Sequence, residues 1–368
     1  MTATPGPFIT GVGVITALGR GLAATREALA AGRSAIAPVT EPGPRKHASP
    51  AARIGPFTTE PEMARSKARR LDLGSQYAIV AAHQCLLDAG YPLAGREERT
   101  GILLGTGSAG AGPLTEFERQ MAAESPESAS PFLFPNTVAN APASQTALEL
   151  KLKGPNVTVI QKDPAALNAM LYARMMLADG RADALLVGAA DEWNLLYHEG
   201  YERILATRSA GRCGHALGEG AGLVLVESAA SVAARGARPY ARLAGVGYRG
   251  SPVSPHRRRG KPEEFVEAMR GALGAEAPRV GLVHLSANGT TWMDDAEQAA
   301  LRALFGDSPP RQVNVKEQIG ENPFAGGVQL ALAAVALREE PSLGAVLVNG
   351  FGAGGNFASV LLTAAAPA

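Results

Sequence analysis

The stretch NVTVIQKDPAALNAMLYARMMLADGRADALLVGAADE, residues 156–192, decides the fold of this chain. It contains a short apolar run, an amphipathic helical segment that Gly180 ends, and a second apolar run. This order predicts a strand–helix–strand unit with a sharp turn where the first strand meets the helix. Asp163 and Pro164 occupy that turn. Because aspartate is favoured as a helix N-cap and proline at the first helical position, we expect Asp163 to cap the helix.

Strand and helix patterns also alternate outside this unit. Ile9–Ile15 and Ile102–Leu104 are predicted strands, whereas Thr25–Ala31 and Leu73–Ala89 have helical patterns. Such alternation predicts an α/β protein whose parallel sheets are covered by helices on both faces.

Separate parts of the chain echo each other. Ile9–Gly13 reads ITGVG and Leu243–Gly247 reads LAGVG, and Ala184–Gly188 is echoed by Ala345–Gly350. We therefore expect two similar α/β halves, an N-terminal half over residues 1–235 and a C-terminal half over residues 236–368. Chance similarity among strands rich in glycine and valine is the alternative explanation.

Composition excludes several classes of function. The 368 residues carry 35 basic and 34 acidic side chains, so bulk attraction to nucleic acid or to an anionic membrane is not expected. No apolar run approaches the roughly 20 residues that a membrane-spanning helix needs, and residues 1–8 lack a secretory signal. Two cysteines, Cys85 and Cys213, are too few for a disulfide framework and fit a reducing cytoplasm.

None of the other charged or polar residues forms a pattern that indicates a cofactor site. No spacing of Cys, His, Asp or Glu indicates a metal site. Cys85 and His284 lie in apolar patterns and are expected in the core. The basic run at 256–259 is interpreted as a solvated loop, with a docking patch for an acidic partner as the alternative.

A series of motifs follows along nearly the whole chain. They are Ile9–Thr16, Ser130–Asn156, Gly218–Gly222, Gly289–Glu297, Lys316–Gly327 and Gly352–Gly355. In order and spacing they resemble the motifs of the β-ketoacyl synthases of fatty-acid and polyketide synthesis, members of the thiolase-like superfamily. The resemblance implies a thiolase-like fold, in which two α/β halves form a five-layered αβαβα arrangement.

In that family a cysteine accepts an acyl group as a thioester, and two histidines stabilise the enolate formed by decarboxylation. The resemblance places the cysteine at Asp163, the first histidine at Asn288 and the second at Glu321. It also implies that Lys316 is the counter-ion of these groups. Since all three chemical residues are replaced, we expect no catalytic residue here but a structural cluster of charges. A catalytic pair of carboxyl groups is the alternative.

The resemblance also locates the family's gate loop. It falls at Phe351, Gly352, Ala353, Gly354 and Gly355, and Ala353 stands where the family has its gating phenylalanine.

Large apolar side chains mark an expected interface. Phe132 and Phe134 lie on a loop with two prolines, and such side chains are costly to expose. The resemblance implies that this loop reaches the acyl tunnel of a partner subunit. Leu114 and Phe117 fall where relatives called chain-length factors place side chains that close the tunnel end.

Chain-length factors are synthase relatives that lost the cysteine, pair with an active ketosynthase and bound its acyl cavity. This chain resembles them in its losses, although many of them carry glutamine at the cysteine position, and Gln161 lies two residues earlier. The loops over 205–218 and 338–346 are short relative to typical synthases. Short loops there fit a subunit that does not itself receive a carrier protein.

The sequence leaves three functional hypotheses. The first is a non-catalytic subunit that forms a heterodimer with an active ketosynthase, with an acyl carrier protein reached through the complex. The second is a thiolase-fold enzyme with altered chemistry, such as decarboxylation of a malonyl thioester, thioester hydrolysis or acyl transfer, using Asp163, Asn288 and Glu321. The third is a homodimeric module that binds acyl thioesters or carrier proteins.

Overall fold

The computed structural model describes residues 6–39, 50–123, 125–206, 216–251, 261–275, 278–352 and 354–365. The expectations for Cys213, Ala353 and the basic run at 256–259 lie outside the described residues.

Two five-stranded half-sheets have the same topology. The first is ordered β6 (Asn156–Ile160), β5 (Thr100–Thr106), β7 (Ala184–Asp191), β9 (Gly220–Glu227), β1 (Phe8–Thr16). The second is ordered β12 (Arg311–Val313), β11 (Val280–His284), β13 (Ala345–Gly352), β14 (Asn356–Ala364), β10 (Ala241–Gly250). In both, the three strands at one end are parallel and the other two pair antiparallel. The expected similarity of the two halves is therefore confirmed.

The half-sheets join where β1 pairs antiparallel with β10, through Phe8↔Arg242 and Ile9↔Ala241. The predicted division at residues 235/236 falls between α8 (Ala229–Arg235) and β10. This boundary stays a prediction.

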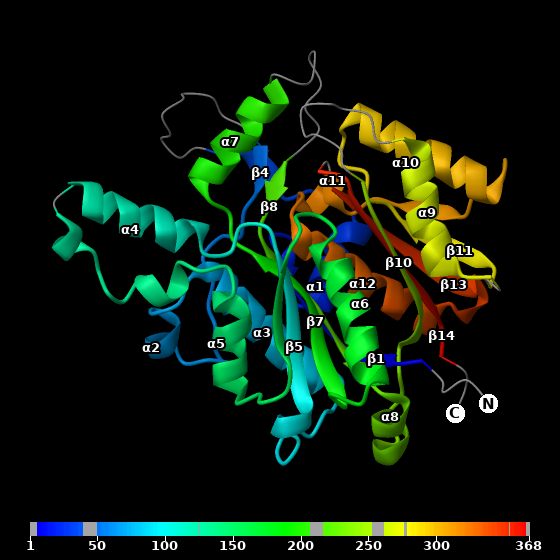
Figure 1. Cartoon of the computed structure of the whole chain (residues 1–368), viewed down its shortest axis with the longest axis horizontal. Coiled ribbons are helices and arrows are strands. Elements are labelled where there is room, and N and C mark those ends of the chain that lie inside the picture. Colours follow the sequence, from blue (N-terminus) through cyan, green and yellow to red (C-terminus); the bar gives the residue numbers. More distant parts are fainter. Residues whose placement is uncertain are drawn as a thin grey trace.

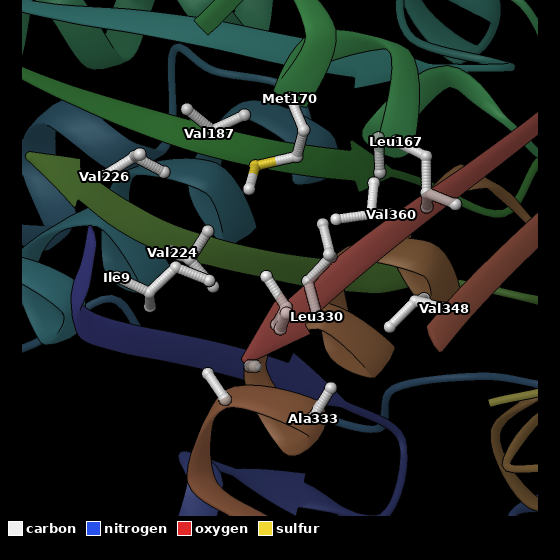
Figure 2. Close-up of a cluster of buried hydrophobic side chains, with 14 of the residues drawn as sticks. Ile9, Leu167, Met170, Val187, Val224, Val226, Leu330, Ala333, Val348 and Val360 are labelled. Carbon is white, nitrogen blue, oxygen red and sulfur yellow. The ribbon is translucent and has the colours of Figure 1, made fainter. Parts of the chain in front are cut away.

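Helices complete the five layers (Figure 1). α6 (Ala165–Ala178) and α12 (Pro323–Glu339) lie between the half-sheets. Figure 2 shows this central core, where Leu167 and Met170 of α6 and Leu330 of α12 lie among strand residues such as Val224 and Val360. The outer helices are α3 (Leu73–Asp88) and α5 (Ala141–Leu150) on the first half-sheet, and α9 (Pro262–Leu273) and α10 (Thr291–Phe305) on the second. Apolar side chains on both faces of each half-sheet explain why helices cover both faces.

The remaining elements lie around this body. The strands are β2 (Gly19–Arg20), β3 (Ile36–Pro38), β4 (Pro50–Ala52) and β8 (Leu217–Gly218), and the last three form a small separate sheet. The helices are α1 (Leu22–Ala30), α2 (Arg65–Ala68), α4 (Ala111–Ala123), α7 (Leu195–Ala206) and α11 (Lys316–Ile319), with single 3-10 turns at Glu97–Arg99, Pro126–Ser128, Phe134–Asn136 and Pro341–Leu343. None of the helices in the described ranges combines the length and apolarity that crossing a bilayer requires.

Glycines in the echoed motifs set the distance between the first strand of each half and its outer helix. A Cβ placed on Gly13 of β1 would lie 1.9 Å from the carbonyl oxygen of Ala81 in α3. A Cβ on Gly247 of β10 would lie 2.0 Å from the carbonyl oxygen of Ala268 in α9. Only glycine allows this contact, so the echoed GVG sequence marks the same packing in both halves.

Gly13→Ala is expected to lower the free energy of unfolding by about 3 kcal/mol, at the upper end of the usual cost of overpacking, because backbone must move to admit the methyl group. Urea denaturation measures the change. Gly55→Ala is the control, since a Cβ on Gly55 meets nothing within 4 Å. Equal stability of the two variants would contradict the proposed helix contact.

Candidate functional site

The turn between β6 and α6 positions Asp163. Lys162 has a left-handed backbone with φ 56°, and the N–H of Ala165 donates to the carbonyl oxygen of Lys162 at 2.9 Å. α6 begins at Ala165 after Pro164, and no side chain caps it. The prediction that Asp163 caps this helix was therefore wrong. Its carboxyl group instead lies beside the side chain of Glu321, whose charge raises the pKa of Asp163.

The structure brings Asp163, Glu321 and Lys316 together. Glu321 and Lys316 are 2% and 5% exposed, and Asp163 is half-buried. The Lys316 Nζ lies 3.5 Å from Glu321 Oε1 and donates to the carbonyl oxygen of Ser286 at 2.9 Å. Asp163 comes from the β6–α6 turn, Lys316 begins α11, and Glu321 is the second residue after α11, so distant segments meet here.

Electrostatics favour one shared proton in this cluster. Burial, and then the charge of Glu321, raise the pKa of Asp163 well above its usual range, although Lys316 opposes the shift. Burial alone would lower the pKa of Lys316, but Glu321, Asp163 and Glu297 raise it overall. Lys316 is therefore charged, and the carboxyl pair retains a proton to a higher pH than an exposed aspartate does.

A second buried carboxyl group supports the lysine. Glu297 of α10 is 1% exposed, and its Oε1 accepts from the Ser286 N–H at 3.0 Å and from Asn349 Nδ2 at 2.8 Å. Burial raises the pKa of Glu297 to about 7. The Ser286 hydroxyl accepts from the N–H of Phe351 at 2.7 Å. Ser286 therefore links Lys316, Glu297 and strand β13.

Asn288 shapes the loop beside the cluster. Its Oδ1 accepts from the N–H of Thr290 at 2.9 Å, and its own N–H donates to Asp294 Oδ1 at 3.1 Å. Burial raises the pKa of Asp294, and Glu321 raises it further while Lys316 lowers it, so this loop lies near both groups. The amide oxygen of Asn288 is thus engaged within its own loop.

The predicted gate loop borders the same turn. Phe351 and Gly352 belong to β13, and a Cβ on Gly352 would lie 3.3 Å from Pro164 Cδ. The Phe351 ring, however, is fully buried with its centroid 4.5 Å from that of Phe265. Phe351 is therefore a core residue, while Gly354 and Gly355 form the turn after β13.

The predicted interface residues lie apart, on an arm formed by residues 111–137. Figure 1 shows its helix α4 projecting from the body. Leu114, Phe132 and Phe134 are 41%, 76% and 61% exposed, and the ring centroids of Phe117 and Phe134 are 5.8 Å apart. No residue of α4 is fully buried. The arm thus presents apolar side chains that the rest of the described chain does not cover.

Sequence reasoning did not single out Asp191, which organises the strand ends around the site. Its Oδ1 accepts from Thr106 Oγ1 at 3.0 Å and from the Gly107 N–H at 2.7 Å, and its Oδ2 accepts from the Phe324 N–H at 3.0 Å. A carboxylate at the end of an apolar strand was the available signal. Lys162 was also missed, because sequence gives no indication that a lysine adopts a left-handed backbone.

The expected core residues are buried. Cys85 is fully buried on α3, and burial raises its pKa well above the usual range. His284 is 2% exposed, and burial lowers its pKa to about 4, so the imidazole is neutral. Within the described ranges, no three His, Cys, Asp or Glu side chains are grouped as metal ligands would be.

Asp163→Asn is expected to raise the free energy of unfolding at pH 9 by about 1 kcal/mol and to change it little at pH 5. A carboxyl group whose pKa is raised by folding stabilises the folded state below its unfolded pKa, and that stabilisation is lost as pH rises through the folded pKa. The asparagine amide can donate a hydrogen bond to Glu321 at every pH, whereas the carboxyl group of Asp163 can donate one only when it is protonated. Urea denaturation at both pH values measures the difference.

The control for that prediction is Asp179→Asn, which changes an exposed carboxyl group at the end of α6. Identical pH dependence of stability in the parent chain and in Asp163→Asn would show that the two carboxyl groups do not share a proton.

Comparisons with known proteins agree on one family. Residues 8–232, more than half of the chain, match the family model described as "Beta-ketoacyl synthase, N-terminal domain". The chain is 28% identical over 357 residues to the 3-oxoacyl-[acyl-carrier-protein] synthase 2 of Vibrio cholerae, covering 90% of this chain and 86% of that protein. It is also 28% identical over 365 residues to the synthase 2 of Rhizobium meliloti, with the same coverage.

Solved structures show the same fold. The ishigamide ketosynthase/chain length factor superposes with a TM-score of 0.89 at 24% identity, covering 99% of this chain and all of that chain. A ketosynthase in complex with its chain length factor from Xenorhabdus doucetiae gives a TM-score of 0.81 at 20% identity, covering 98% of both chains. With the family model, this arrangement of layers and motifs shows that the chain belongs to the β-ketoacyl synthase family.

Proposed function

We propose that this chain is a non-catalytic, chain-length-factor-like subunit that pairs with an active ketosynthase and bounds its acyl tunnel. The pathway would be of the polyketide, polyene or fatty-acid type. The observation that carries the proposal is that Asp163 lies beside Glu321 and Lys316, with Lys316 Nζ 3.5 Å from Glu321 Oε1, where the resemblance to the family places its nucleophile and one histidine. Similar folds in ketosynthase/chain length factor structures support it.

The chemistry of the site supports a structural role. Asp163 is a poor acyl acceptor, because an acid anhydride hydrolyses readily, and because its raised pKa favours the protonated, weakly nucleophilic carboxyl group. Asn288 cannot move a proton near neutral pH. An ionised Glu321 would repel an enolate. The cluster is therefore suited to hold the fold together and unsuited to the family's reaction.

Exposed apolar surface on this chain supports the proposal that a partner subunit binds it. Among the described residues, strand β6 pairs only with β5, so no described strand covers its other edge. Beside this edge, Leu148 of α5, Ile160 of β6 and Met175 of α6 are 72%, 60% and 54% exposed. A free edge flanked by apolar side chains is typical of a subunit interface. We propose that the partner ketosynthase covers this edge and that the arm at 111–137 reaches toward its tunnel.

A groove lies between α2, α5 and the loop that carries Phe132, and it encloses about 530 Å³. Its charge is mixed, because Glu149 also lines it and pairs with Lys67 at 3.0 Å. Since the exposed Phe132 and Leu148 line the same groove, we propose that the partner ketosynthase covers it and that the acyl carrier protein is reached through the complex.

Co-purification tests the main proposal. The full chain is co-expressed with a ketosynthase encoded beside it, and native mass spectrometry measures the complex. The expected result is a 1:1 heterodimer, with acyl chain length set only when both subunits are present. A stable homodimer that ignores every such ketosynthase would contradict the proposal.

One observation favours a second candidate, an enzyme of altered chemistry. A proton shared by two carboxyl groups could serve as a general acid toward a thioester carbonyl. Purified chain incubated with acyl and malonyl thioesters tests this. Turnover that Asp163→Asn and Glu321→Gln both abolish would establish it in place of the structural role.

A further inference from the structure

The Lys162 side chain crosses from the Asp163 turn to the end of strand β5. Its Nζ donates to the carbonyl oxygen of Gly107 at 3.2 Å. Lys162 is one of two described non-glycine residues with positive φ, the other being Lys151. A left-handed backbone is unfavourable for lysine, so this conformation persists because its contacts hold it.

The Gly107 end of this contact is hydrogen-bonded to Asp191 and packs against the segment that follows Glu321. The Gly107 N–H donates to the buried carboxylate of Asp191 at 2.7 Å. A Cβ on Gly107 would lie 3.1 Å from Pro323 Cδ, and Pro323 follows Glu321 by two residues. Since Lys162 precedes Asp163, its side chain connects the two segments that carry the carboxyl pair.

A third element joins at the same ammonium group. The Lys162 Nζ lies 4.1 Å from the centroid of the Tyr197 ring on α7, within the range of a cation–π contact. Tyr197 in turn packs on Tyr201, with ring centroids 5.1 Å apart. Lys162 therefore ties α7 and the β5 end to the turn that carries Asp163, with its outer side exposed to solvent.

We propose that Lys162 is a closing residue, whose side chain spans the mouth of the Asp163–Glu321 site and excludes acyl thioesters from it. The inference goes beyond the proposed function, because it concerns access to this chain's own site whether or not a partner binds. Burial lowers the pKa of Lys162, while the charges of Asp163 and Asp191 oppose this shift.

A thiol at position 163 reports access to the site. Asp163→Cys is made with Cys213→Ser, which leaves Cys85 as the only other thiol, and Cys85 is fully buried. Alkylation by iodoacetamide is then compared with and without Lys162→Asn. Asparagine tolerates the left-handed backbone but cannot reach Gly107. Loss of the Lys162 cation by itself raises the pKa of the thiol at position 163 and so lowers the fraction of thiolate. Alkylation rates are therefore divided by the thiolate fraction, which pH–rate profiles give.

Lys162→Asn is expected to raise the alkylation rate per thiolate at least about tenfold. Without the Lys162 contacts the site should open more often, and alkylation requires the open state. Lys162→Arg, which keeps length and charge, should leave the rate near that of the parent. Lys153→Asn is the control, since Lys153 pairs with Glu98 on the surface. An unchanged or slower rate in Lys162→Asn would overturn the proposal.

If Lys162→Asn fails to fold in this background, Tyr197→Leu supplies the same test by removing the second anchor. It is expected to accelerate alkylation severalfold, and an unchanged rate would again overturn the proposal. Co-purification with the ketosynthase is measured separately, so failure of the closing role and failure of the proposed function give different results.

Discussion

Lys316→Met is expected to lower the free energy of unfolding by about 3–5 kcal/mol, the usual cost of removing one partner from a buried ion pair. Lys316 is 5% exposed, and the carboxyl groups of Glu321, Asp163 and Glu297 all act on it. Methionine fills similar volume but leaves these carboxyl groups without a counter-ion. Urea denaturation at pH 7 measures the loss.

The pH dependence identifies the cause of that loss. At pH 5 the carboxyl groups are more fully protonated, so the penalty should shrink, and it should grow toward pH 9. Adding Glu321→Gln to Lys316→Met removes one uncompensated carboxyl group and should recover part of the stability.

Lys153→Met removes an exposed lysine and serves as the control. It should leave unfolding unchanged within error. A loss in Lys316→Met that is independent of pH, or that Glu321→Gln does not reduce, would show that Lys316 acts by packing and not by charge.

The double variant Phe132→Asp with Phe134→Asp is expected to weaken binding to the partner ketosynthase at least about 100-fold, as loss of two aromatic anchors of an interface would. Both rings are mostly exposed in the single chain, so folding should persist. An aspartate at either position would bury an uncompensated charge in the complex. Sedimentation of the mixed subunits measures binding, and thermal unfolding confirms the fold.

Leu87→Asp is the matched control for the interface. Leu87 is 83% exposed near the end of α3, so Leu87→Asp changes an exposed apolar residue that lies outside the arm. Undiminished heterodimer formation by the Phe132/Phe134 variant would show that the arm does not contribute to the partner interface.

Local patterns predicted the main elements closely. The strand expected at Ile9–Ile15 is β1, Phe8–Thr16, and the helix expected at Leu73–Ala89 is α3, Leu73–Asp88. These succeed because hydrophobic period and glycine stops are local properties of the chain. The strand expected at Ile102–Leu104 extends further, to Thr100–Thr106, because pairing with β6 and β7 adds residues that lack a strong pattern.

The capping prediction for Asp163 failed for a physical reason. Capping preference describes what an aspartate does next to a helix when no stronger partner is near. Here a buried carboxyl group from a segment more than 150 residues away supplies that partner, and the left-handed backbone at Lys162 aims the turn toward it.

The sequence by itself determined the order of strands and helices and the two similar halves, because residue identity and spacing carry that information. Only the tertiary structure decided that Asp163, Glu321 and Lys316 lie together and that the Lys162 ammonium group reaches the carbonyl oxygen of Gly107. Those contacts depend on where distant segments meet in space, and no local pattern encodes the distance between two side chains.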